Sequence, residues 1–125
     1  MLKECRQALR ITTNAYDGEL CSLMDAGAMD LQIAGVQLPG TVSFQLVSSG
    51  TTSYYQDDST LTDALVMRAI FTYADWLFFK DAPNQDAKRE IYNLQKVQLM
   101  HATGYTDYGE DQETEPDPGD GGDGE

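Results

Sequence analysis

The sequence predicts a mainly α-helical fold: a small bundle of about four helices, an extended excursion or β arm between the second and third, and a disordered acidic C-terminal tail. Three observations support this. Four segments repeat apolar residues at helical spacing, one intervening segment is rich in Ser, Thr and Gly, and the tail is acidic. A chain of 125 residues supports one domain at most. We expect a helical domain over 1–104 and a largely disordered tail over 105–125.

The first two helices are expected over residues 2–10 and about 17–33. Leu2, Cys5 and Leu9 share one face of the first helix through their i, i+3 and i+4 spacing. The stripe of the second helix that we expect to be buried consists of Leu20, Leu23, Met24, Ala28 and Leu31. Without CxxC spacing or nearby histidines, the two cysteines are expected to be reduced core residues.

Residues 36–59 form the excursion. Its segment TVSFQLV (41–47) alternates and contains β-branched residues, which predicts a short strand. A single strand cannot satisfy its own backbone hydrogen bonds, so it must pair within the excursion or with another chain.

The third helix is expected to begin after a cap at Ser59 or Thr60, with Asp63 near the capping-box position. It is the most apolar helix, and we expect it to be central and buried on two sides. Its apolar positions are Leu61, Leu65, Val66, Ala69, Ile70, Tyr73, Trp76 and Leu77.

The fourth helix is expected over about 86–102. Helical spacing predicts that its apolar residues face inward: Ile91, Leu94, Val97 and Met100. Its basic residues are expected to face outward: Lys88, Arg89 and Lys96.

The charge of the chain is uneven. It carries 21 acidic and 8 basic residues, a formal net charge of −13, and the segment 105–125 contains acids but no base. The domain before the tail is therefore only mildly acidic. This excess of acids argues against binding to nucleic acid through its phosphates. It also argues against binding to anionic membrane surfaces.

No motif in the sequence indicates catalysis. His101 is the only histidine and has no nucleophile turn of the GxSxG kind. Asp57, Asp58 and Asp63 do not follow the EF-hand pattern. Asp75 lies within the apolar third helix, where it is expected to face solvent or to pair with Arg68 or Lys80. We therefore expect no enzyme activity, no cofactor and no metal site.

Four features of the sequence resemble the head-tail connector proteins of long-tailed bacteriophages. They are a first helix ending in LRI, a second helix opening on acids, a third reading LTDALVMRAIFTYADWLF and a fourth reading KREIYNLQKVQLMHATGY. The resemblance covers most of residues 1–108. The excursion at 36–59 and the acidic tail depart from the family pattern.

This resemblance implies a ring, commonly of about twelve copies, docked under the portal at the capsid vertex. Such a ring continues the DNA channel and gives the next neck or tail protein a surface to bind. The implied partners are other copies of the chain, the portal protein and a downstream head-closure or tail protein, with DNA only in passage and no membrane. The implied location is the neck of the virion, after synthesis in the host bacterial cytoplasm.

Two interfaces are expected. The resemblance implies that the C-terminal part contacts the portal. The residues expected in this portal interface are Leu99, Met100, His101, Tyr105 and Tyr108. The strand that needs a partner and the surplus of aromatic residues on the third helix indicate the interface between subunits, which gives Val42, Phe44, Leu46, Trp76, Phe78 and Phe79.

Two other readings of the sequence remain open. One is a head-closure or tail-completion protein, which belongs to a class that is more often rich in β-strands. The other is a small helical regulatory binding module, which would have no affinity for portal or tail components.

Overall fold

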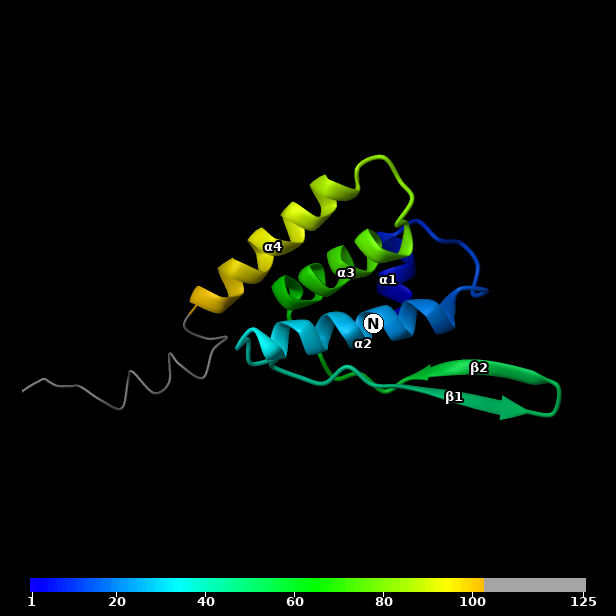
Figure 1. The fold of residues 1–125 in the computed structure, drawn as a ribbon. Coiled ribbons are helices and arrows are strands. Elements are labelled where there is room, and N and C mark those ends of the chain that lie inside the picture. The colour runs from blue at the N-terminus through cyan, green and yellow to red at the C-terminus, as the bar shows by residue number, and fades with distance from the viewer. Residues whose placement is uncertain (103–125) are drawn as a thin grey trace, which may run out of the picture.

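The fold was analysed in a computed structural model that describes residues 1–102 (Figure 1). Its elements, in chain order, are α1 (Leu2–Ala8), α2 (Asp17–Ile33), β1 (Phe44–Ser49), β2 (Thr52–Asp57), α3 (Ala64–Phe78) and α4 (Gln85–His101). Four helices with a β-hairpin between the second and third confirm the predicted fold class. The acidic tail and the predicted domain end at residue 104 lie outside the described residues. Within 1–102, no helix is long and apolar enough to cross a membrane.

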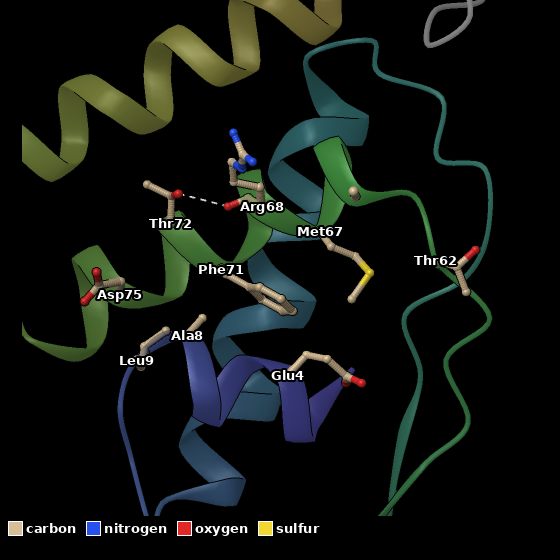
Figure 2. A pocket seen from close by; sticks show the side chains of 10 residues that line it. Glu4, Ala8, Leu9, Thr62, Met67, Arg68, Phe71, Thr72 and Asp75 are labelled. Carbon is tan, nitrogen blue, oxygen red and sulfur yellow. Dashed lines mark hydrogen bonds between the residues drawn. The ribbon is translucent and has the colours of Figure 1, made fainter.

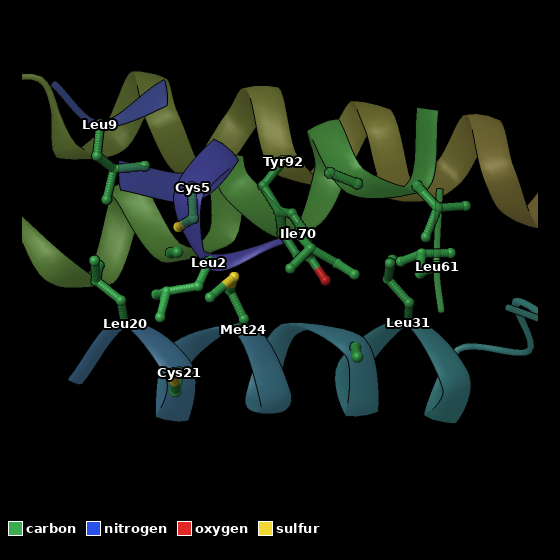
Figure 3. Packing of buried hydrophobic residues seen from close by; sticks show 14 of the residues in the cluster. Leu2, Cys5, Leu9, Leu20, Cys21, Met24, Leu31, Leu61, Ile70 and Tyr92 are labelled. Carbon is green, nitrogen blue, oxygen red and sulfur yellow. The ribbon is translucent and has the colours of Figure 1, made fainter. Parts of the chain in front are cut away.

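Helix α3 is central, as predicted. It packs against α2 on one side and α4 on the other, while α1 crosses behind α2 and α3 (Figure 1). Figure 3 shows Leu2 and Cys5 of α1 lying between Met24 of α2 and Ile70 of α3. Each of these four side chains is at most 4% exposed, so α1, α2 and α3 share one apolar core.

The two cysteines lie in this core, as predicted. Cys5 and Cys21 are both buried and both free thiols. Burial raises the pKa of each thiol to about 12, so both are protonated at neutral pH.

Helix α3 begins later than predicted, and its cap is a different residue. Asp63 is the N-cap, and its carboxylate accepts hydrogen bonds from the N–H groups of Leu65 and Val66. The predicted caps, Ser59 and Thr60, instead bind the segment that leads into β1. We call this segment, residues 37–43, the strap. The Ser59 hydroxyl accepts from the N–H of residue 43, and the Thr60 hydroxyl accepts from the N–H of residue 41.

The strand of the excursion pairs within the excursion. It begins at Phe44 rather than at residue 41, and it pairs antiparallel with β2 in the register Phe44↔Asp57 to Ser49↔Thr52. Gly50 starts the two-residue turn with φ +64°, a conformation that favours glycine. The outer edges of β1 and β2 pair with no other described strand.

Gly40 allows the strap to cross close to the start of α3. A Cβ added at Gly40 would lie 2.7 Å from the Cα of Leu61 and 2.8 Å from its backbone nitrogen. Since these contacts are with backbone, any side chain at position 40 would push the strap away from residues 60–61. The glycine therefore fixes where the hairpin leaves the helical core.

Candidate functional site

Helix α4 is attached to the rest of the molecule through the buried side chains of Tyr92 and Leu99 and through polar contacts. The Tyr92 hydroxyl donates to the carboxylate of Asp30 on α2, and Lys96 Nζ lies 3.2 Å from the same oxygen. Lys88 Nζ lies 3.0 Å from Asp75 Oδ1 on α3. Thus Asp75 has a basic partner, but it is a residue of α4 rather than the predicted Arg68 or Lys80.

The rotation of α4 is opposite to the one predicted. The described residues of α4 that are buried are Tyr92 and Leu99. Ile91, Leu94 and Val97, which were expected to face inward, are 48%, 63% and 45% exposed. Met100 is also exposed, at 36%.

Tyr92 explains this rotation. Its ring packs against Tyr73, with centroids 5.2 Å apart, and stacks on Trp76 at 6.3 Å. A helix has 3.6 residues per turn, so Lys88 and Lys96 lie on the same side as Tyr92, close to their acidic partners. The prediction that these two lysines face outward was wrong. Arg89 is exposed, as predicted.

An apolar stripe consequently covers the outer side of α4. We call the residues Ala87, Ile91, Leu94 and Val97 the outer α4 stripe; all four are exposed. Such a row of exposed apolar residues typically marks an interaction surface. The 4-3 spacing of Ala87, Ile91 and Leu94 is the spacing with which helices pack side by side.

The β-hairpin forms a second exposed feature. Its tip projects beyond the helices (Figure 1), and Leu46 and Tyr54 are 56% and 52% exposed. Tyr55 holds β2 against α2, because its hydroxyl lies where a side chain at Gly18 would stand. Asp57, the last residue of β2, fixes the same end of the hairpin by accepting hydrogen bonds from the Met1 amino group and the N–H of Leu2.

The residues predicted for the subunit interface are not gathered on one exposed surface. Leu46 is exposed, whereas the other five are half-buried and pack against the core: Val42, Phe44, Trp76, Phe78 and Phe79. Trp76 belongs to the aromatic cluster around Tyr92, and Phe78 contacts Tyr16 edge-on.

The residues predicted for the portal interface lie at the end of α4 or beyond it. Leu99 is buried, while Met100 and His101 are exposed in the last turn of the helix. Tyr105 and Tyr108 lie outside the described residues.

A groove of about 440 Å³ separates α1 from α3 (Figure 2). Met67 and Phe71 of α3 lie between the two helices, and Glu4 of α1 stands at the rim. The groove is lined by neither histidine nor cysteine, and the Thr72 hydroxyl donates to the carbonyl of Arg68. This arrangement provides no activated nucleophile.

The acidic residues considered as metal ligands have structural partners. Asp57 anchors α1, Asp63 caps α3 and Asp58 accepts a hydrogen bond from Gln56. Residues 1–102 contain no group of three or more His, Cys, Asp or Glu side chains that could hold a metal ion.

Comparison of the chain with protein-family models, with curated proteins and with solved structures finds no match. The outer α4 stripe and the hairpin are therefore the features on which a function can be argued. Sequence reasoning identified Leu46 but placed the α4 stripe in the core. The signal it missed is Tyr92, a large aromatic residue on the opposite side of the helix from Leu94.

Proposed function

We propose that this protein is a structural subunit of the head-tail connector of a long-tailed bacteriophage. Copies of it form a ring at the portal vertex that joins the capsid portal to the tail and continues the DNA channel. The proposal combines the resemblance of the helical sequences with a fold whose most exposed apolar features face away from its own core.

The outer α4 stripe is the observation that carries this proposal. A ring subunit must contact a neighbour on each side through two different surfaces, so it needs apolar area outside its core. Helix α4 provides such area without giving up its attachment, because Asp30 and Asp75 hold its polar side. The projecting hairpin, with exposed Leu46 and Tyr54, offers a further contact.

The charge distribution fits a channel through which DNA passes. Acidic residues outnumber basic ones even without the C-terminal segment 105–125. Lys88 and Lys96 are engaged with Asp75 and Asp30 inside the fold. Phosphate binding needs clustered free Lys and Arg. A protein in which acids outnumber bases therefore favours the passage of DNA over its retention.

The alternatives fit less well. Head-closure and tail-completion proteins are more often β-rich, whereas helices make up more than half of residues 1–102. A small helical regulatory module would use the same exposed stripe for another partner. It is distinguished by having no affinity for portal or tail components.

Co-sedimentation with the portal protein of the same phage tests the proposal. We expect the full chain to sediment with portal particles and a chain ending at Ala102 to bind less. The truncation leaves Leu99 in place, because that residue is buried and its loss would disturb α4. Gln7→Ala, at an exposed position of α1, serves as the matched control and should bind like the unmodified chain. A full chain that stays in the supernatant would contradict the proposal.

A further inference from the structure

Helix α2 carries an outer stripe of its own, which consists of one serine and three apolar residues. Ser22, Ala26, Met29 and Ile33 are all exposed and recur at spacings of four, three and four residues. Ile33 is 79% exposed and Met29 is 58% exposed. We call these four residues the outer α2 stripe. It lies opposite the side on which α2 packs against the core through Leu20, Met24 and Leu31.

We propose that the outer α4 stripe of one copy packs antiparallel against the outer α2 stripe of a second copy. This inference rests on the proposed assembly of a ring and identifies the two surfaces that meet in it. Both helices are 17 residues long. Read from its C-terminal end, the α2 stripe places Ile33, Met29 and Ala26 at spacings of four and three residues, as the α4 stripe places Ala87, Ile91 and Leu94, so these two rows match when the helices are antiparallel.

The sizes of the side chains favour the antiparallel orientation. In each stripe the small residues are at the N-terminal end and the large ones follow. Antiparallel packing places Ala26 opposite Leu94 and Ile33 opposite Ala87, with Met29 and Ile91 in the middle. Parallel packing would place small residues together at one end and large ones at the other, which would splay the two helices.

Pairing unlike stripes also accounts for both exposed surfaces with a single contact. Pairing α4 with α4 would leave Ile33 and Met29 uncovered, and pairing α2 with α2 would leave Leu94 uncovered. A contact between two different surfaces repeats from copy to copy and closes into a ring when the rotation permits. Because only a few side chains form each stripe, the contact is smaller than the roughly 1,600 Å² of a standard interface. Weak association of free copies and strong association in a ring are therefore expected.

Cysteine cross-linking tests this pairing. Ile33→Cys and Ala87→Cys are made in separate chains, mixed and oxidised, both as free protein at high concentration and after assembly on portal particles. The native thiols stay out of the reaction because they are buried and their pKa values are raised to about 12. Residues that face each other across the contact fall within the roughly 6 Å between Cα atoms that a disulfide spans.

We expect a cross-linked dimer in the mixture and none with either variant alone. A chain that carries both substitutions should give a ladder of cross-linked oligomers. The matched control mixes Ile33→Cys with Gln98→Cys, which lie about 16 Å apart along antiparallel helices and should not cross-link.

Three outcomes would overturn the inference. Dimers of Ala87→Cys alone would show that α4 pairs with α4, and dimers of Ile33→Cys alone would show that α2 pairs with α2. Absence of the mixed dimer in both conditions would show that the two stripes do not meet. If portal binding persists in that last case, the pairing is wrong and the connector function stands. If the mixed dimer forms without portal binding, the pairing stands and the connector function is wrong.

Discussion

The core helices α1 to α3 and the two attached elements, α4 and the hairpin, are held in the molecule by different kinds of contact. Helix α2 buries Leu20, Met24 and Leu31 completely. Helix α4 has the same length but buries only Tyr92 and Leu99, and its polar contacts with Asp30 and Asp75 complete the attachment. The hairpin likewise combines the packing of Phe44 and Tyr55 against the core with a carboxylate, Asp57, that binds the first turn of α1.

This difference shows how a small chain can expose apolar surface and still be ordered. Where polar contacts supply part of the attachment, other apolar side chains of the same element are free to face outward.

Truncation in the core should cost far more than truncation on the outer side of the same helix. Leu20→Ala removes a side chain with no exposed surface, and we expect the free energy of unfolding to fall by about 2–5 kcal/mol. Met29→Ala, at a 58% exposed position of α2, should change it by less than about 0.5 kcal/mol. Urea denaturation followed by circular dichroism measures both, and equal losses would contradict the assignment of the two sides of α2.

Removing one polar attachment of α4 should have an intermediate effect. Burial and the hydrogen bond to Asp30 both raise the pKa of the Tyr92 hydroxyl, so it stays protonated and donates to the carboxylate. Tyr92→Phe should lower the free energy of unfolding by about 1.5–3 kcal/mol, as expected for a lost hydrogen bond to a charged group. Hydrogen exchange should show the loss of protection in α4 first. Tyr54→Phe, at an exposed position of the hairpin, is the control.

The attachment of the hairpin should depend on pH. Burial of Asp57 raises its pKa, but hydrogen bonds from the Met1 amino group, Leu2 and Ser59 outweigh it and lower the pKa from 3.8 to about 2. Because the pKa is lower in the folded state, the carboxylate stabilises the fold above pH 3.8. This contribution is lost as the pH falls through about 2.

Asp57→Asn should therefore flatten the fall in stability between these two pH values, while Asp58→Asn should leave it unchanged. Urea titrations repeated across this pH range provide the measurement. A steep fall that persists in Asp57→Asn would show that other groups cause it.

The sequence predicted the core helices better than the attached elements. The spacing of Leu2, Cys5 and Leu9 leaves only one apolar face on α1, so its burial followed from the sequence alone. Helix α4 has apolar residues on two sides, and periodicity could not choose between Tyr92 and Leu94. The choice depends on Asp30 and Asp75, which come from other helices and meet α4 only in the folded chain.

The candidate site was predicted in part for the same reason. Val42, Phe44 and Leu46 were predicted together for the subunit interface, but only Leu46 is exposed, because Val42 and Phe44 pack against the core. The pairing of β1 was left open, although Gly50 at the turn was a signal for a hairpin. Asp63 was placed near the start of α3 but not as its cap, because the sequence does not reveal that Ser59 and Thr60 bind the strap.

The stability of Leu94→Ala is the most direct test of the account, since its central claim is that the apolar stripe of α4 faces outward. Leu94 is 63% exposed, so the free energy of unfolding measured in urea should change by less than about 0.5 kcal/mol. A loss of about 2–5 kcal/mol, the cost of truncating a buried leucine, would place Leu94 in the core and contradict the account.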